Sequence, residues 1–200
     1  MSDLGVVSVL LGIKVNRNRS SGYLQLIQDH YIKSILEKFN MSHCNPTTTS
    51  ADGITDTSGT PLDSAGIHRY QELVGSFIYL ATCTRPDIAF AMMRLSRDLQ
   101  MHACDQESGR SISGYIFTLA GAAISWSSKL QPVVAQSTIE AEYIALGDAA
   151  NEAVYLDRFI TQLGPFKMEI ITIHEENMEP LHLASKIFSA KTKHTFGITI

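Results

Sequence analysis

One long stretch in the second half of the chain limits the possible folds more than any other feature. Residues 138–163 place apolar side chains at roughly helical spacing, which predicts one helix with a single buried face. Ser137 or Thr138 can cap its first turn, and Gly164-Pro165 can end it. The predicted buried positions are Tyr143, Leu146, Ala150, Val154, Leu156, Phe159, Ile160 and Leu163.

The residues around the start of this helix leave two interpretations open. A short apolar run, residues 133–135, is expected to be a strand. Glu140 or Glu142 then falls in the first turn, where a carboxylate meets the positive end of the helix dipole. A strand that delivers a carboxylate to a buried helix is typical of a metal site, but an ordinary capped helix has the same pattern. The spacing alone favours the ordinary helix.

Two motifs in this half carry a family resemblance. Residues 137–146 are S-T-I-E-A-E-Y-I-A-L, and residues 111–130 are S-I-S-G-Y-I-F-T-L-A-G-A-A-I-S-W-S-S-K-L. They resemble the S-T-x-E-A-E-Y-x-A and S-T-S-G-Y-x-F-x-L-x-G-x-x-I-S-W-x-S-K signatures of the ribonuclease H domain in copia-type LTR-retrotransposon Pol polyproteins. The resemblance implies an α/β (α+β) fold with an incomplete ribonuclease H-like mixed sheet and helices. The pattern also predicts a buried strand at residues 168–173 and a helix at residues 180–188.

The first forty residues are expected to form a hairpin and a helix. Residues 6–15 are rich in β-branched side chains and predict a strand, residues 16–22 a turn, and residues 23–28 a second strand. Asp29 can cap the helix that follows. The segment resembles the copia-type reverse transcriptase just after its polymerase active site, whose Y-x-D-D carboxylates belong upstream and are absent from this chain. The buried face of the helix is predicted to hold Ile32, Ile35, Leu36 and Phe39.

Two further helices are predicted between residues 68 and 101. Residues 68–82 have a helical pattern, and the T-R-P-D sequence that follows at residues 84–87 ends this helix and starts the next. The run Y-Q-E-L-V-G-S-F-I-Y-L-A-T-C-T-R-P-D-I-A-F-A resembles a thumb or connection segment of the same family, which is not catalytic. Arg85 and Asp87 are therefore interpreted as an ion pair at a helix start. The buried stripe of the second helix is predicted to hold Ile88, Met92, Leu95 and Leu99.

The resemblance fails at residues 102–111. The family places several dozen residues before the strand that starts near Ser111, including the first strand of the nuclease sheet, whereas this chain has only M-H-A-C-D-Q-E-S-G-R, residues 101–110. We therefore expect an internally deleted copy in three parts. Residues 1–101 are a reverse transcriptase thumb/connection remnant of a hairpin plus helices, residues 102–112 a deletion junction, and residues 113–200 a ribonuclease H-like domain lacking its first strand. The strand edges next to the lost strand, at residues 114–119 and 168–173, are expected to be unpaired.

Composition excludes some classes of protein. The chain has a net charge of −4, which argues against a strongly basic nucleic-acid surface. Cys44, Cys83 and Cys104 form no C-x-x-C pair, which indicates free thiols and an intracellular, non-secreted protein. No apolar run approaches membrane-spanning length, so no membrane partner is expected. Residues 45–67 have the composition of a loop or linker.

The nuclease chemistry of the family needs four carboxylates that hold two Mg²⁺ ions about 3.5–4 Å apart. By resemblance, Glu142 matches the helix glutamate, and Glu176 matches the aspartate of a second strand with one extra methylene. The first-strand aspartate is deleted, and Phe196 occupies the fourth position. Glu142 and Glu176 are therefore predicted as vestigial catalytic and metal-binding residues, without productively bound Mg²⁺.

Other candidate groups are assigned ordinary roles. Trp126 is predicted to lie in the core or on a sheet face. Three histidines fit no common zinc spacing and are predicted to be solvated: His174, His182 and His194. Three lysines are predicted to be solvated rather than to bind phosphate: Lys186, Lys191 and Lys193.

As a whole, the sequence predicts a degenerate copy of the reverse transcriptase/ribonuclease H region of a Pol polyprotein. We expect no polymerase or nuclease activity of its own, and weak or no binding to RNA–DNA hybrid. Two alternatives stay open. A partner Pol chain can complete it, which an upstream reading frame carrying Y-x-D-D would favour. It can also be a co-opted non-catalytic module for RNA–DNA hybrid or Pol proteins, which salt-dependent hybrid binding would favour.

Overall fold

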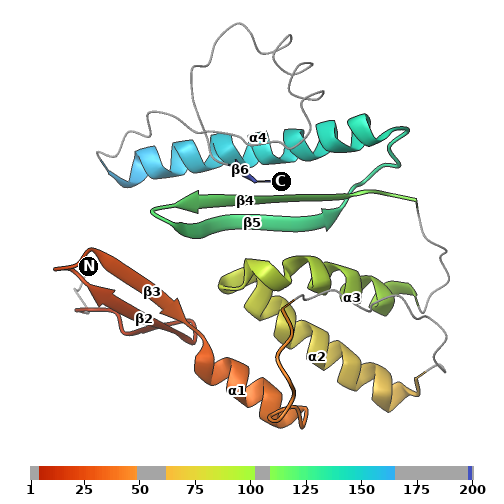
Figure 1. Cartoon of the computed structure of the whole chain (residues 1–200), viewed down its shortest axis with the longest axis horizontal. Helices are drawn as coiled ribbons and strands as arrows, with labels where there is room; N and C mark the ends of the chain where they lie inside the picture. Colours follow the sequence, from red (N-terminus) through yellow and green to blue (C-terminus); the bar gives the residue numbers. More distant parts are fainter. Residues whose placement is uncertain (1–4, 49–61, 102–108, 165–197, 200) are drawn as a thin grey trace, which may run out of the picture. The chain divides into compact units, whose positions relative to one another are not determined.

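The computed structural model describes residues 5–48, 62–101, 109–164 and 198–199. These residues form helices and small antiparallel sheets, so the expected mixture of helix and strand is confirmed. The chain divides into two compact units, Met1–Leu99 and Gln100–Ile200, each with its own sheet and helical structure (Figure 1).

The first unit begins with an antiparallel sheet of β1 (Val9–Leu10), β2 (Ile13–Asn18) and β3 (Tyr23–Ile27), in that order. The β2–β3 pair confirms the predicted hairpin, but residues 6–15 do not form one strand. Leu11 and Gly12 have φ values of 50° and 76° and make a two-residue turn that reverses the chain inside the predicted strand.

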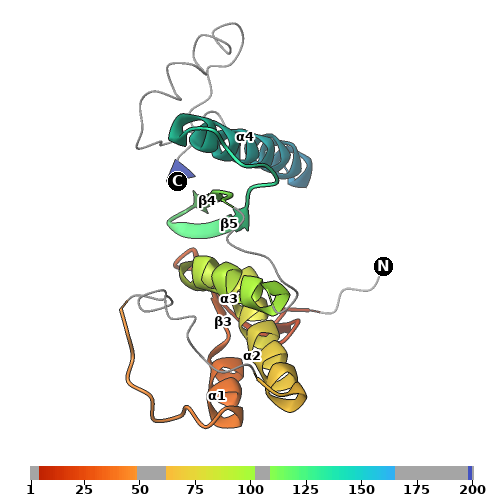
Figure 2. The ribbon, with the colours of Figure 1, turned by 90° about the vertical axis from the view of Figure 1, so that its right-hand side faces the viewer.

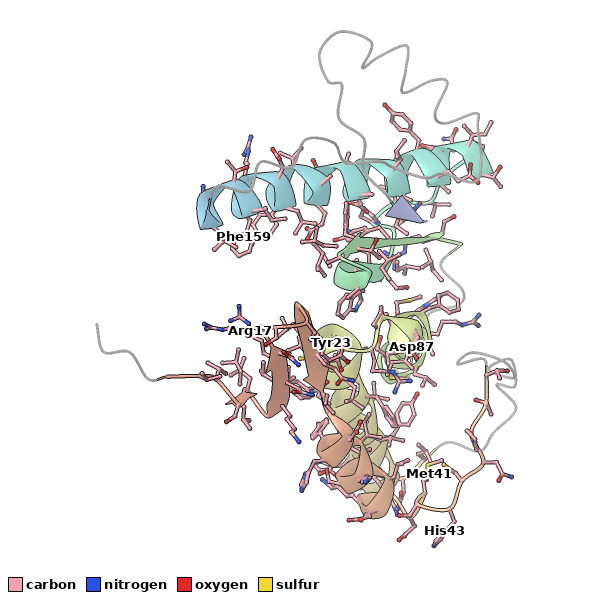
Figure 3. All side chains as sticks on the ribbon, turned by 60° about the vertical axis from the view of Figure 1, so that its left-hand side comes forward. Arg17, Tyr23, Met41, His43, Asp87 and Phe159 are labelled. Carbon is pink, nitrogen blue, oxygen red and sulfur yellow. The ribbon has the colours of Figure 1, made fainter. Side chains whose placement is uncertain are left out.

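The side chains of this small sheet contribute little to a core. Figure 3 shows Arg17 and Tyr23 among the side chains that the hairpin displays. The large apolar side chains that are at least half exposed include Val9, Leu10, Tyr23, Leu24 and Leu26. The apolar core of the first unit therefore lies among its helices.

Helix α1 (Asp29–Lys38) follows β3, but Asp29 is not its cap. Gln28 holds the N-cap position without a side-chain capping bond, and Asp29 is the first helical residue. The reason is that Gln28 is buried and its Oε1 accepts a 2.6 Å hydrogen bond from Thr84 Oγ1, which fixes it at the helix start. On the predicted face, Ile35 is buried and the other three residues are half-buried.

Helix α2 (Ser64–Cys83) begins four residues earlier than predicted because Asp63 caps it. Asp63 Oδ1 accepts a 2.8 Å hydrogen bond from the Gly66 N–H. A short 3₁₀ helix, η1 (Pro86–Ile88), leads into α3 (Ala89–Met101), as the T-R-P-D sequence predicts. The helix core comprises buried Ala81, Ala91 and Met92 with Phe77, Ile88 and Leu95 packed against them, which confirms three of the four stripe positions. The Leu99 side chain lies outside the described part of the chain.

The second unit contains a sheet in the order β5-β4-β6. Strands β4 (Ile112–Leu119) and β5 (Ala122–Leu130) form a hairpin closed by Ala120 and Gly121, with φ values of 51° and 81°. β6 (Ile198–Thr199) pairs antiparallel with the other edge of β4 at Ile116 and Phe117. The expectation that this edge is unpaired is therefore wrong at two positions, because the C-terminal residues supply extended backbone there.

Helix α4 (Thr138–Leu163) confirms the long predicted helix, with Gly164 at its C-cap. Ser137 is the cap, since its Oγ accepts a 3.1 Å hydrogen bond from the Glu140 N–H. Glu140 Oε2 in turn accepts one at 2.7 Å from the N–H of Gln136, the residue before the cap, so Glu140 also ties the chain that enters the helix.

Residues 133–135 are not a strand, contrary to the prediction. β5 ends at Leu130, and Pro132 cannot donate a hydrogen bond to extend the ladder. Val133 and Val134 are consequently more than half exposed. The connection from β5 to α4 is irregular, so no strand delivers the helix start.

The buried face of α4 consists mainly of alanine. Its buried residues are Ala145, Leu146, Ala149, Ala153 and Leu156. Among the predicted positions, Tyr143, Val154, Phe159 and Leu163 are instead 39–69% exposed, while Ala150 and Ile160 are half-buried. The prediction favoured large apolar side chains, whereas small side chains let a helix approach a sheet closely.

Several predicted features lie outside the described residues. They are the strand at residues 168–173, the helix at residues 180–188, residues 49–61 of the loop and residues 102–108 of the junction. The single residues are Cys104, His174, Glu176, His182, Lys186, Lys191, Lys193, His194 and Phe196.

Candidate functional site

Helix α4 lies along one face of the β4–β5 hairpin (Figure 2). Phe117 of β4 is buried with three α4 residues, and Tyr115 packs against this cluster. Alternate strand residues share a face, so the α4-facing side of the hairpin is defined by these positions. It holds Ser113, Tyr115 and Phe117 of β4 and their partners Lys129, Ser127 and Ser125 of β5.

Gln131 links this hairpin to the first turn of α4. Its backbone N–H donates to Ser111 O at 2.8 Å, and its side-chain Nε2 donates to Ser113 Oγ at 2.9 Å and to Ala141 O at 2.7 Å. Gln131 is 0% exposed and Ser113 is 2% exposed. Because buried polar groups require partners, these bonds fix the start of α4 against the start of β4.

Glu142, the predicted helix ligand, follows directly after Ala141. It is half-buried and shares a helix face with Ala145, Leu146 and Ala149, three, four and seven residues later. The structure therefore places Glu142 on the side of α4 that packs on the sheet, near the start of β4. Glu176 lies outside the described residues, so its pairing with Glu142 stays a prediction.

Two other carboxylates on α4 were missed by the motif-based prediction. Asp148 Oδ1 lies 3.1 Å from Lys129 Nζ, and Glu152 Oε1 accepts a 2.6 Å hydrogen bond from Ser125 Oγ. A sequence signal for them exists: acidic residues four apart on a helix, and Ser, Ser and Lys at alternate positions of a strand. These residues form polar contacts between helix and sheet.

Tyr115 lies among these polar groups. Burial raises the pKa of its phenol, and the negative charges of Glu152 and Asp148 raise it further, opposed by a hydrogen bond with Ser127. The phenol is therefore protonated at neutral pH. A neutral phenol beside two engaged carboxylates suits a structural network and does not provide an activated nucleophile.

The described residues do not assemble a metal centre on their own. Among them, no group of three or more His, Cys, Asp or Glu side chains could hold a metal ion. Asp148 is a poor substitute ligand because the Lys129 ammonium beside it repels a cation. Of the two predicted Mg²⁺ ligands, Glu142 is the one that lies in the described part of the chain.

Arg85 and Asp87 form the predicted ion pair at a helix start, which confirms the structural role. Arg85 Nη2 lies 2.7 Å from Asp87 Oδ2, and Arg85 Nε donates to Asp87 Oδ1 at 2.8 Å. Trp126 is half-buried on the sheet face opposite α4, since it pairs with Ile116, which confirms a sheet-face position. Cys44 is a free thiol, as expected.

Comparison with known proteins reveals the family. Over an alignment of 242 residues covering 97% of this chain, the chain is 33% identical to the "Retrovirus-related Pol polyprotein from transposon TNT 1-94" of Nicotiana tabacum. It is 30% identical, over 92% of its length, to the corresponding polyprotein from transposon RE1 of Arabidopsis thaliana. The chain belongs to the copia-type retrotransposon Pol polyproteins.

The chain spans 18% and 15% of the lengths of these two Pol polyproteins. A shorter relative is the "Uncharacterized mitochondrial protein AtMg00810" of Arabidopsis thaliana, which is 28% identical over 78% of this chain and 80% of its own length. No family model and no solved structure matches the chain. In the part of the chain that the structure describes, no helix is long and apolar enough to cross a membrane.

Proposed function

We propose that this chain is a remnant of the reverse transcriptase and ribonuclease H region of a copia-type Pol polyprotein, without activity of its own. One observation carries this proposal. The match to the tobacco polyprotein covers 97% of 200 residues, about 194, yet the alignment is 242 residues long, so the relative has about 48 positions without a counterpart here. An internal loss of several dozen residues, which the sequence predicts at residues 102–112, would leave this number of positions in the relative without a counterpart.

The element order supports an incomplete ribonuclease H-like sheet in the second unit. Two antiparallel strands, β4 and β5, precede a long helix that covers one face of their hairpin. On its other edge, the described part of the chain pairs β4 with the two residues of β6 alone. A sheet that has lost one long strand beside β4 would have this form. The first unit, a hairpin with helices, then corresponds to the thumb/connection remnant.

The proposed loss of nuclease activity follows from the needs of two-metal catalysis. Mg²⁺ requires near-octahedral oxygen ligands and tolerates displacement poorly. Of the four carboxylates in the family, this chain retains Glu142 on α4 and the longer Glu176, with Phe196 at a third position. Groups that act as a unit lose activity together when some are removed. A productively bound Mg²⁺ pair is therefore not expected, and binding to RNA–DNA hybrid should be weak or absent.

The test is cleavage of the RNA strand of an RNA–DNA hybrid by the purified chain, in Mg²⁺ or Mn²⁺. We expect no cleavage. Metal-dependent cleavage that disappears in Glu142→Gln, but persists in the matched variant Glu140→Gln, would refute the proposal. Cleavage that persists in both variants would identify a contaminating nuclease.

Polymerase activity is proposed to be absent for a separate reason. The Y-x-D-D aspartates that bind the catalytic metals in the family have no counterpart in these 200 residues. Primer extension on an RNA template by the purified chain is expected to be undetectable. Extension above that of a mock purification would show that this part of the proposal is wrong.

A further inference from the structure

We draw no further inference here: the strongest candidate, the surface patch that the β1–β3 sheet of the first unit makes from exposed apolar side chains beside Lys14, Arg17 and Arg19, carries nothing because no contact of the described residues shows what covers it.

Discussion

At the residue scale, Gln131 joins the start of α4, next to Glu142, to the start of β4. Its buried side chain bridges Ser113 and the Ala141 carbonyl. Gln131→Ala leaves these two buried groups without that partner and is expected to cost about 1–3 kcal/mol of unfolding free energy. Urea unfolding followed by Trp126 emission measures this in the second unit, and Gln136→Ala, at an exposed position, is expected to change it by less than about 0.5 kcal/mol. Equal losses in both variants would contradict the bridging role.

The ion pair of Arg85 and Asp87 predicts a pH-dependent effect. A hydrogen bond with Arg85 lowers the pKa of Asp87 below its ordinary value. A lowered folded-state pKa stabilises the fold above the ordinary aspartate pKa of about 3.9, and this contribution is lost as pH falls through the lowered value. Because both side chains are about half exposed, Asp87→Asn is expected to cost only roughly 0.2–1 kcal/mol at neutral pH.

Urea unfolding at several pH values, followed by far-ultraviolet circular dichroism, checks this expectation. The difference between the wild-type chain and Asp87→Asn should shrink towards zero in acid. Arg85→Ala breaks the same ion pair by removing the guanidinium, and its loss of unfolding free energy should show the same pH trend. A difference that is constant with pH would mean that the carboxylate charge is not responsible.

At the element scale, local patterns were enough to predict the β2–β3 hairpin and the helices. They failed at two places: inside residues 6–15, where the chain reverses, and at residues 133–135, where the strand pairing has already ended. Gly12 and Pro132 are the residues responsible, and both were visible as breaks within apolar runs. Glu142 was predicted as a site residue through its motif, and that role stays a prediction. The contacts of Gln131, Asp148 and Glu152 could not be predicted, because their partners depend on the register between β4, β5 and α4, which no single segment encodes.

The start of α4 offers a test at this scale, since the sequence left Ser137 and Thr138 as equal candidates for the cap. The hydrogen bond from the Glu140 N–H selects Ser137. Ser137→Ala is expected to cost about 0.5–2 kcal/mol, whereas Thr138→Ala, inside the first turn, should cost much less. Urea unfolding monitored by Trp126 emission distinguishes them, and a larger loss in Thr138→Ala would reverse the assignment.

At the scale of the whole molecule, the proposed inactivity belongs to no single element. α4 is intact, capped and packed, and it holds Glu142 against the sheet. The proposed loss lies in what surrounds it: a strand beside β4, and the ligands that other segments supply in the family. A well-formed helix can therefore retain a ligand position without retaining the chemistry, because two-metal catalysis needs all its ligands in one geometry.

Repair of the chain should then require all the missing parts together. We expect hybrid cleavage in Mg²⁺ only when a strand carrying the family's aspartate is inserted between residues 101 and 112 and combined with Glu176→Asp and Phe196→Asp. The two substitutions without the strand should stay inactive, alone or together, because the strand aspartate then has no backbone beside β4 to hold it. In the repaired chain, Glu142→Gln should abolish cleavage. Asparagine in place of the aspartate of the inserted strand should abolish it too, because that variant restores the sheet without the charge.

Cleavage by the doubly substituted chain without the strand would show that the ligand geometry is more tolerant than proposed. A repaired chain with native-like Trp126 emission that leaves the hybrid intact would show that the loss extends beyond these three positions.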